Sequence, residues 1–409
     1  MSNNLDSLRY IIVGAGQAGA ETAMSLRKHG FDGRITLIGE EVQLPYRRPP
    51  LSKAYFSGDV TEDSLYVAKP AMLEKNAVEF IGGSRVEEID RDRKQVILSD
   101  ASRLAYDKLA ITTGGRARPL TCPGSALEGV YLLRTLADVG RIRARLNSCD
   151  RMVIVGGGFI GLEVAASARK LGIDVTVVET MGRVLARVTA PVVSSFFERI
   201  HGEAGVVLRM GASVKAFEGD GHVETVVLEH GEEISADIVI VGIGLIANTE
   251  LAEAAGLSCD NGILVDEFAR TRDADIVAAG DCANHPNRFA SGRTRLESVQ
   301  NALDQSRVAA ASMLGKSVPY DSVPWFWSDQ YDCKLQMAGL SGMYDEIVLR
   351  GDPNTGRQFA AFYLREGVLI AADCVNRPQD FMFAKKLVAA GAKPDKALLA
   401  DLDKSLKAL

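Results

Sequence analysis

Cysteine is scarce in this sequence, with six residues in a chain of 409. No two of them stand in a C-x-x-C spacing, which argues against a zinc ribbon and a thioredoxin-like redox motif. Six cysteines in a chain of this length do not indicate a disulfide scaffold either. No stretch approaches the ~18 consecutive apolar residues of a membrane span, and the first residues lack the basic and apolar regions of a signal peptide. We therefore expect a cytoplasmic protein with no membrane partner.

Positive charge and histidine are also in short supply. The formal net charge is −6, which disfavours nucleic acid as a partner, because proteins that bind it are usually basic. The five histidines form no H-x-x-x-H or H-E-x-x-H pattern, so we expect no metal site. A G-x-S-x-G elbow is absent too, which leaves a hydrolase without its nucleophile.

Glycine, in contrast, is abundant, with 39 residues, and two glycine-rich segments resemble each other. Residues 9–19 and 151–161 each consist of a β-branched strand followed by G-x-G-x-x-G. Each segment leads into a helical stretch and then into another strand; these stretches are 20–28 and 34–38, and 162–171 and 174–178. The strand–helix–strand order predicts a parallel pair in each case, and therefore two dinucleotide-binding units in tandem.

The first motif consists of Gly14, Gly16 and Gly19. In such motifs the first glycine permits a tight turn, the second lets the backbone approach a pyrophosphate, and the third lets helix and strand pack closely. The pyrophosphate lies on the helix N-terminus. Glu40 follows the second strand, where an acidic residue binds the ribose hydroxyls. Strand, helix, second strand and acid all occur in order, which favours a dinucleotide site over glycines that serve packing alone.

The second motif repeats this logic with Gly156, Gly158 and Gly161, and with Glu179 at the end of its second strand. A carboxylate at that place accepts from the 2′-hydroxyl of NAD and repels the 2′-phosphate of NADP. NADH is therefore favoured. Arg183 and Arg187 lie nearby and weaken this preference, because an arginine can serve a 2′-phosphate.

The rest of the chain indicates further strands and a change of texture near the C-terminus. From Val323 onward, short strands precede a helix, which is typical of a smaller α+β domain. We therefore predict an α/β fold class with two tandem Rossmann-like dinucleotide-binding domains plus a smaller C-terminal α+β domain. The further strands are predicted at 86–90, 95–98, 109–115, 213–217, 223–228, 237–244, 276–281, 359–364 and 368–372, and the helices at about 297–314 and 380–389.

Two dinucleotide units together with the segment 276–281, which ends in Gly280 and Asp281, resemble the glutathione-reductase-like flavoprotein superfamily. The resemblance implies that the first unit binds FAD and the second unit binds the nicotinamide cofactor. It also implies that Asp281 contacts the ribityl and phosphate region of the flavin. On the residues alone, an aspartate that ends a turn or caps a helix is the commoner case.

Residues 46–55, Tyr-Arg-Arg-Pro-Pro-Leu-Ser-Lys-Ala-Tyr, narrow the family. In NADH oxidases, NADH peroxidases and coenzyme-A disulfide reductases of this superfamily, a redox cysteine lies at about the Lys53 position, and this sequence has no cysteine before Cys122. The segment looks like that of the NADH-dependent FAD-containing ferredoxin reductases of bacterial oxygenase systems, the putidaredoxin-reductase type. Segments 113–115, 133–135, 183–185, 295–301 and 324–330 agree, so the resemblance covers nearly the whole chain.

The resemblance implies domain boundaries and cofactor contacts residue by residue. The FAD-binding domain would comprise residues 1–116 and 245–320, the NADH-binding domain 117–244, and the C-terminal α+β domain 321–409. Without the resemblance, Ala18, Val86 and Val299 would be assigned to ordinary apolar packing and Trp327 to the core. The FAD contacts implied are Gly14, Gly16, Ala18, Gly19, Glu40, Arg48, Lys53, Val86, Thr113, Gly114, Arg134, Asp281, Val299 and Trp327. The NADH contacts implied are Gly156, Gly158, Ile160, Gly161, Glu163, Glu179, Arg187, Gly244, Glu297 and Ser298, with Arg183 as a substitute for Arg187.

Lys53 and Glu163 are the candidate catalytic residues. The flavin supplies the redox chemistry, while the protein tunes its orientation and its electric field. A lysine near the flavin favours added negative charge on the reduced ring, and a glutamate can hold that lysine and contact the nicotinamide amide. We predict an ion pair between the two beside the flavin. The alternative is a solvated loop lysine and an exposed helix residue, because Lys and Glu are rarely buried unless paired.

The electron acceptor implied by the resemblance is a small acidic [2Fe–2S] ferredoxin. Arg307, Trp325 and Trp327 fall at positions that face it in the resembling enzymes. A local basic patch would steer such a partner, although a solvated charged face is the more common fate of surface arginines. The oligomeric state expected is a monomer or weak dimer. The residues proposed for the patch are Arg288, Arg293, Arg295, Arg307 and Lys334.

The activity implied is transfer of a hydride from NADH to FAD, followed by transfer of single electrons to the ferredoxin. That ferredoxin would serve a cytochrome monooxygenase or a Rieske dioxygenase. Two alternatives stay open. One is a reductase for rubredoxin or a nitrite-reductase-type subunit, and the other is a redox-linked signalling flavoprotein of the apoptosis-inducing-factor type.

Overall fold

The computed structural model describes residues 8–408, and the chain divides into two compact units. The first unit contains the chain up to Arg47, Glu62–Arg116 and Ile246–Pro324. The second unit contains Arg48–Thr61, Ala117–Leu245 and the chain from Trp325 onward. Strands β8 (Gly115–Ala117) and β17 (Leu245–Ala247) lie where the chain passes from one unit to the other. The three-domain boundaries expected from the sequence stay a prediction.

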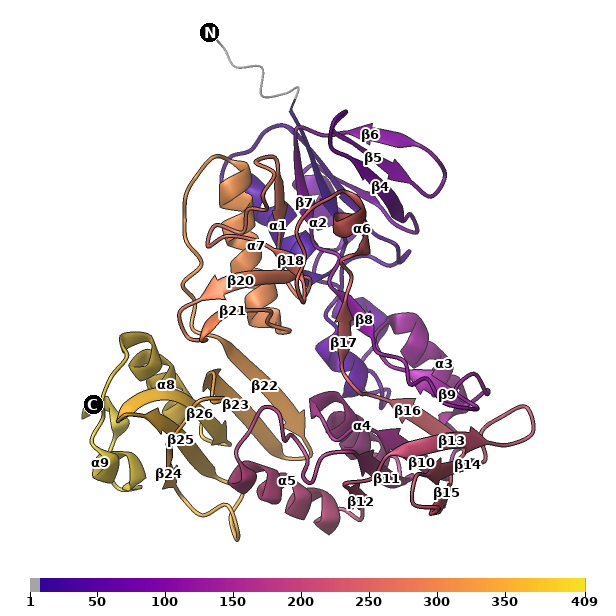
Figure 1. Cartoon of the computed structure of the whole chain (residues 1–409), viewed down its shortest axis with the longest axis vertical. Coiled ribbons are helices and arrows are strands. Elements are labelled where there is room, and N and C mark those ends of the chain that lie inside the picture. The colour runs from indigo at the N-terminus through magenta and orange to yellow at the C-terminus, as the bar shows by residue number, and fades with distance from the viewer. Residues whose placement is uncertain (1–7, 409) are drawn as a thin grey trace. The chain divides into compact units, whose positions relative to one another are not determined.

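The first unit is built on a five-stranded parallel sheet in the order β19-β7-β1-β2-β3. Alternate residues of a strand point to opposite faces of the sheet. In the central strand β1, the residues on both faces are buried. Tyr10 and Ile12 pack into one apolar cluster, while Ile11 and Val13 pack into another. Helices α1 and α7 lie side by side in this unit (Figure 1). The bounds are β1 Arg9–Val13, β2 Arg34–Ile38, β3 Val78–Ile81, β7 Lys108–Ile111, β19 Ile276–Ala278, α1 Gln17–Lys28 and α7 Val299–Met313.

Smaller elements complete the first unit. Two three-stranded sheets have the orders β4-β5-β6 and β18-β20-β21. The first of them is antiparallel throughout. The bounds are β4 Val86–Asp90, β5 Gln95–Leu98, β6 Arg103–Ala105, β18 Ile263–Leu264, β20 Ala283–Asn287, β21 Gly292–Thr294, α2 Pro70–Lys75, α6 Glu250–Ala254 and η3 Glu62–Leu65.

The second unit repeats the parallel sheet in the order β12-β11-β10-β16-β9. An antiparallel sheet, β13-β14-β15, is added to it. The bounds are β9 Val130–Leu132, β10 Arg151–Val155, β11 Asp174–Glu179, β12 Val207–Met210, β13 Val214–Glu218, β14 Thr225–Leu228, β15 Glu233–Ser235, β16 Ile238–Val241, α3 Leu136–Leu146, α4 Phe159–Lys170, α5 Pro191–Glu203 and η2 Pro49–Ser52.

The C-terminal part of the second unit is an antiparallel sheet in the order β22-β23-β26-β25-β24, with α8 packed against β26 and β23. This part runs from orange to yellow in Figure 1. Every residue of β25 except the last is buried, so this strand is covered on both faces of the sheet. The bounds are β22 Trp325–Gln330, β23 Cys333–Gly339, β24 Glu346–Arg350, β25 Phe359–Arg365, β26 Val368–Val375, α8 Pro378–Ala390, α9 Lys396–Ala400 and η4 Leu406–Ala408.

The predicted fold class is confirmed. The differences lie at element ends and in elements that were not expected, which include the helices α3 and α5 and the strands β22, β23 and β24. Helices α1 and α4 begin at Gln17 and Phe159, three residues before the expected starts. Each helix therefore begins directly after the second glycine of its motif, as an anion-binding N-terminus requires. The short strands β6 and β15 were not expected, because three residues carry too little alternation to indicate a strand.

Candidate functional site

The first glycine motif forms a bare turn between β1 and α1. Gly14 has φ +106°, and a Cβ there would lie 2.3 Å from the carbonyl oxygen of Thr112. A Cβ on Gly19 would lie 2.0 Å from the carbonyl oxygen of Gly14. Gly16 is the N-cap of α1, and a Cβ there would meet no heavy atom of the described chain within 4 Å. The outer two glycines are thus fixed by packing, while the middle one leaves the helix N-terminus open to a phosphate group.

The second motif has the same geometry in the second unit. Gly156 has φ +114°, with a hypothetical Cβ 2.4 Å from the carbonyl oxygen of Gly242. A Cβ on Gly161 would lie 2.0 Å from the carbonyl oxygen of Gly156. Gly158 caps α4, and within the described chain a Cβ there would again have no neighbour closer than 4 Å. Both turns therefore fit a dinucleotide pyrophosphate.

The two acidic residues differ in how firmly they are held. Glu40 is exposed, with Oε1 3.4 Å from Nη1 of Arg85. Glu179 accepts hydrogen bonds from the backbone N–H groups of Gly157 and Met181, both at 2.7 Å. Its carboxylate is therefore oriented by the glycine turn itself, at the place expected for the ribose hydroxyls of NADH.

Replacing Glu179 by glutamine is expected to raise the ratio of kcat/KM for NADPH to that for NADH by about 10- to 100-fold. The amide keeps one acceptor for the turn but removes the charge that repels a 2′-phosphate. Steady-state kinetics with both cofactors measure the ratio. Glu40→Gln, at the corresponding position of the first unit, is the control and should leave it unchanged. A ratio unaltered in Glu179→Gln would remove this residue from cofactor selection.

Of the two arginines near Glu179, one is committed to its own loop. Arg183 donates to the side chain of Ser194 at 2.5 Å and to the carbonyl oxygen of Ala186 at 2.9 Å. Arg187 is exposed, and no hydrogen bond or ion pair of its side chain is found within residues 8–408. Arg187 is therefore the arginine available to a ligand, whereas Arg183 supports the loop.

The remaining predicted FAD positions of the first unit lie around the carboxyl ends of its parallel strands. Gly280, with φ +84°, donates its N–H to Gln305 at 2.9 Å and turns the chain from β19 to Asp281. Thr113 donates to the carbonyl oxygen of Asn248 at 2.8 Å, and Gly114, with φ +61°, follows it. The strand ends of an open parallel sheet are where cofactors bind, so these places agree with the predicted role.

Packing explains several other predicted residues without any ligand. Ala18 and Val86 are buried, and a Cβ on Gly280 would lie 3.0 Å from that of Ala18. Val299 is the first residue of α7, after the N-cap Ser298, whose hydroxyl accepts from the N–H of Asn301 at 3.0 Å. Their cofactor roles stay predictions. The same holds for three other residues: Glu297 pairs with Arg295 at 2.7 Å, Ile160 is exposed, and Gly244 has φ +109°.

In the second unit the structure brings Lys53 and Glu163 together. Nζ of Lys53 lies 2.7 Å from Oε2 of Glu163, and their side chains are 18% and 4% exposed. The predicted ion pair is confirmed, and the alternative of an exposed helix glutamate is wrong. Ser52 donates to Oε2 of Glu163 at 2.6 Å, and Ser328 donates to Oε1 at 2.6 Å. Glu163 therefore has a partner on each carboxylate oxygen, which a buried charge requires.

Two further predicted residues meet in this unit. Arg48, at the N-cap of η2, donates through Nη1 to the carbonyl oxygen of Arg134 at 2.7 Å. The segment that carries Lys53 is therefore tied to the turn before α3.

Sequence reasoning did not assign Ser52 or Ser328, the two serines that donate to Glu163. Both belong to segments that carry the family resemblance, and that membership is the one signal that could have identified them.

The aromatic residues of β22 form a cluster at the edge of the C-terminal sheet. The ring centroids of Trp325 and Trp327 are 5.6 Å apart. The ring centroid of Phe326 lies 4.7 Å from that of Phe159 at the start of α4. Nζ of Lys385 lies 5.4 Å from the ring centroid of Trp325. Trp327 is half-buried, which leaves part of the ring available to a ligand or a partner.

The predicted basic patch is largely neutralised within its own units. Arg307 is 53% exposed, but its guanidinium pairs with Glu21 at 2.7 Å and Asp304 at 3.0 Å. The other four cations also have acceptors; Arg288 pairs with Asp321, Arg295 with Glu297 at 2.7 Å, Lys334 with Asp329 at 3.8 Å, and Arg293 donates to the carbonyl oxygens of Val265 and Asn284. Because four of the five cations pair with carboxylates, these residues give a weaker positive field than their number suggests.

Burial disfavours the thiolate form of the cysteines. All six are free thiols, and burial raises the pKa of Cys149 to about 12 and the pKa values of Cys259 and Cys333 to about 11. Such thiols carry little thiolate at neutral pH, and the thiolate is the reactive form.

Among residues 8–408 no cluster of three metal-ligating side chains occurs. Nor does any helix in that range have the length and apolarity needed to span a membrane.

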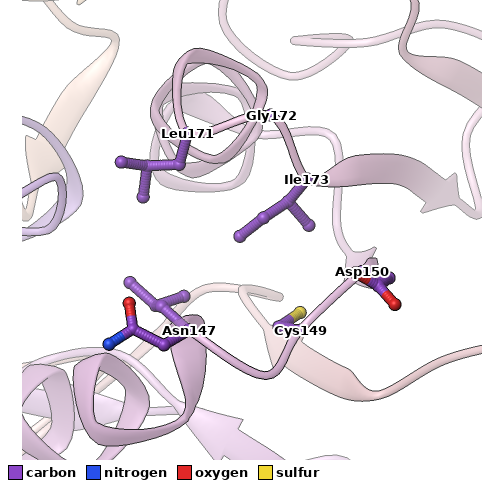
Figure 2. A pocket seen from close by; sticks show the side chains of 7 residues that line it. Asn147, Cys149, Asp150, Leu171, Gly172 and Ile173 are labelled. Carbon is purple, nitrogen blue, oxygen red and sulfur yellow. The ribbon is translucent and has the colours of Figure 1, made fainter.

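Figure 2 shows a surface pocket of the second unit. It is lined by Leu146, Asn147, Cys149, Asp150, Leu171, Gly172 and Ile173. These residues end α3 and α4 and precede β10 and β11, so the pocket lies at the amino edge of the parallel sheet. Nucleotides bind at the carboxyl edge of such sheets. The pocket is therefore separate from the dinucleotide turn.

Comparisons with known proteins agree with this geometry. Residues 8–306 match the family model described as pyridine nucleotide-disulphide oxidoreductase, and residues 325–409 match the one described as reductase C-terminal. The chain is 46% identical to rhodocoxin reductase of Rhodococcus erythropolis, over 98% of this chain and 94% of that protein. It is 45% identical to putidaredoxin reductase of Pseudomonas putida, over 97% and 95% of the two chains.

A solved structure is also similar throughout. The putidaredoxin reductase chain in its covalent complex with putidaredoxin aligns with a TM-score of 0.94 at 45% identity, covering 98% of this chain and 97% of that one. The paired glycine turns, the antiparallel C-terminal sheet and these similarities lead to one assignment. The chain belongs to the pyridine nucleotide-disulphide oxidoreductase family, among its ferredoxin reductases with the reductase C-terminal domain.

Proposed function

We propose that this protein is an NADH-dependent ferredoxin reductase containing FAD. It oxidises NADH and passes single electrons to a [2Fe–2S] ferredoxin that serves a cytochrome monooxygenase or a Rieske dioxygenase. The observation that carries the proposal is the buried Lys53–Glu163 ion pair, with Nζ and Oε2 2.7 Å apart. Lys53 stands at about the position where the resembling NADH oxidases, NADH peroxidases and coenzyme-A disulfide reductases have a redox cysteine, and no cysteine precedes Cys122. The chemistry is therefore electron transfer and not thiol–disulfide exchange.

The residues present support both cofactors. The open backbone at Gly16 and at Gly158 gives each unit a place for a pyrophosphate. Bound FAD supplies the conversion between the two-electron chemistry of NADH and the one-electron chemistry of an iron–sulfur cluster. The protein holds one carboxylate near the second turn, at Glu179, and one beside an ammonium, at Glu163. The first selects NADH, and the second orients the nicotinamide.

We also propose that the protein acts in the cytoplasm as a monomer or weak dimer. Its six cysteines are all unpaired, which agrees with a compartment where thiols stay reduced.

NADH-driven reduction of cytochrome c should depend on an added [2Fe–2S] ferredoxin. The purified protein with FAD is expected to give little cytochrome c reduction alone and at least about 100-fold more with a suitable ferredoxin, because the ferredoxin is the acceptor that docks on the reductase and carries its electrons one at a time to the cytochrome. A panel of ferredoxins and a rubredoxin, each with NADH and NADPH, measures this. Turnover with rubredoxin alone would support the rubredoxin reductase alternative. A long-lived complex with NADH and no turnover with any acceptor would support a signalling flavoprotein.

A further inference from the structure

A continuous chain of polar side chains, buried except at its outer end, ends on Glu163. It starts at Tyr331, runs through His201 of α5 and through Gln330 and Ser328 of β22, and reaches Oε1 of Glu163. All of these residues belong to the second unit. His201 and Ser328 are fully buried, and Gln330 is 1% exposed. Buried polar groups of this kind must be satisfied by one another.

The hydrogen bonds of the chain run in one direction. The Ser328 hydroxyl donates to Oε1 of Glu163 at 2.6 Å, and Nε2 of Gln330 donates to the Ser328 hydroxyl at 3.1 Å. Oε1 of Gln330 must then accept, and it lies 2.8 Å from Nε2 of His201. Every donor therefore points toward the carboxylate. In a low-dielectric interior, aligned hydrogen bonds of this kind strengthen one another.

The outer end of the chain has the protonation that this direction requires. Burial lowers the pKa of His201 to about 4, so the imidazole is neutral at pH 7. Its Nε2 carries the proton, and Nδ1, 3.1 Å from the hydroxyl of Tyr331, accepts from that hydroxyl. Burial raises the pKa of Tyr331 to about 12, so the phenol keeps its proton.

The opposite oxygen of Glu163 is fixed by η2. Lys53 lies 2.7 Å and Ser52 lies 2.6 Å from Oε2, and Ser167, one turn along α4, donates to the carbonyl oxygen of Ser52 at 2.9 Å. Lys53 is the ion-pair partner found for Glu163 in the described part of the chain. The carboxylate is therefore held from two sides, by η2 on one oxygen and by β22 on the other.

We propose that Ser328, Gln330 and His201 are positioning residues that fix the carboxylate of Glu163 against Lys53 for the oxidation of NADH. Ser328 acts directly on Glu163, Gln330 orients Ser328, and His201 orients Gln330. The inference rests on the proposed function, because it gives Glu163 its place beside the nicotinamide. It assigns a role to a histidine and an amide that do not touch either cofactor motif.

Two variants and their combination test the order of the chain. Ser328→Ala removes the donor to Glu163, and Gln330→Met removes the amide while keeping the side-chain length. Each should lower the limiting rate of flavin reduction by NADH in stopped-flow measurements about 10-fold, with a smaller change in the dissociation constant for NADH. Because Gln330 acts through Ser328, the double variant should lose no more than Ser328→Ala alone. Losses that multiply would contradict a chain and indicate separate packing defects.

A matched control removes a buried hydroxyl from the same sheet outside the chain. The hydroxyl of Tyr363 on β25 donates to the buried Asp373 and lies 3.2 Å from the N–H of Ala190. Tyr363→Phe should lower the melting temperature at least as much as Ser328→Ala does, while leaving the rate of flavin reduction unchanged. A rate that follows the melting temperature across all three variants would overturn the positioning role.

The direction of the chain is tested without turnover. In the holoenzyme labelled with 15N-histidine, His201 should give the signals of a neutral ring protonated at Nε2 at pH 7. Loss of these signals in His201→Phe assigns them. A ring protonated at Nδ1, or a charged ring, would reverse the chain and overturn the proposal. If the protein failed to reduce any ferredoxin, the proposed function would fail, yet reduction of its flavin by NADH and the NMR result would still test the chain.

Discussion

Replacing Gly158 by alanine should raise the dissociation constant for NADH about 100-fold, since about two hydrogen bonds from backbone N–H groups to a charged pyrophosphate are worth about 3 kcal/mol. Gly158 has φ −81° and ψ −177°, which alanine adopts without strain. A Cβ there meets nothing within 4 Å in the described chain, so the protein itself tolerates the methyl group. The space it fills is the approach to the N-terminus of α4.

Titration of the oxidised enzyme with NAD⁺ or an unreactive NADH analogue measures the binding, and thermal unfolding measures the fold. FAD content should stay at the wild-type level. Gly140→Ala in α3 is the control, because that glycine is exposed within a helix and its Cβ would also meet nothing within 4 Å. It should leave binding unchanged and stabilise the helix by about 0.5–1 kcal/mol.

Gly16→Ala is the counterpart in the first unit. It should yield a folded protein that retains little FAD, visible as loss of the yellow colour, because Gly16 is equally free of neighbours in the structure. Gly156→Ala tests a glycine that the fold itself requires. Its φ of +114° and the 2.4 Å approach to Gly242 should make that variant unfold instead. If Gly158→Ala bound NADH as the wild type does, the second motif would not be the nicotinamide nucleotide site.

Replacing Lys53 by methionine should lower the rate of flavin reduction by NADH about 100-fold, because a charge pair beside a reacting centre contributes roughly 3 kcal/mol. The side chain of Glu163 is only 4% exposed. Removing its cation leaves a buried carboxylate with hydroxyl donors alone, at a cost of about 3–5 kcal/mol in stability. The rate and the stability are therefore expected to fall together in this variant.

A double variant separates the two effects. In Lys53→Met/Glu163→Gln no charge is buried without a partner, so most of the lost stability should return. The rate of flavin reduction should stay low, because the ammonium is still missing. Stopped-flow absorbance at the flavin band and chemical unfolding give the two quantities. A double variant that regained the wild-type rate would assign the pair a role in stability alone.

The dinucleotide units could be predicted from the sequence because their signal is local. The strand, the three glycines and the acid lie within about 30 residues of one another, and each has a fixed stereochemical task. The structure shows those tasks at Gly14 and Gly156, which both have positive φ and touch the backbone of the neighbouring strand end. The helix starts were expected three residues late, because the first turn of each helix contains the third glycine of the motif, which lowers helix propensity.

The hydrogen-bonded chain on Glu163 could not be predicted in this way. Ser52 and Ser328 lie 111 and 165 residues from Glu163, and His201 lies 129 residues from Gln330. Short polar side chains carry no spacing signature, and their partners are set by how α4, α5 and β22 pack. Lys53 and Glu163 were paired through the family resemblance, which supplied the long-range contact that the residues alone do not indicate.

The predicted basic patch shows a different limit of prediction from sequence. Counting arginines identified Arg288 and Arg307 as candidates, but their carboxylate partners, Asp321 and Glu21, become apparent only in the folded chain. Glu21 is 286 residues from Arg307. A charge count along the sequence therefore overestimates a surface potential whenever distant carboxylates lie next to the cations.

The assignment of residues 48–61 to the second unit has a practical consequence for dissecting the protein. These residues include Lys53, although the chain directly before and after them belongs to the first unit. A fragment that starts after residue 116 would lack the ammonium and leave Glu163 without its cation. Residues 48–61 would have to be grafted onto such a fragment for the charge pair to exist there. The pair is thus a property of two distant pieces of chain, and a gene-level boundary at the second glycine motif would divide it.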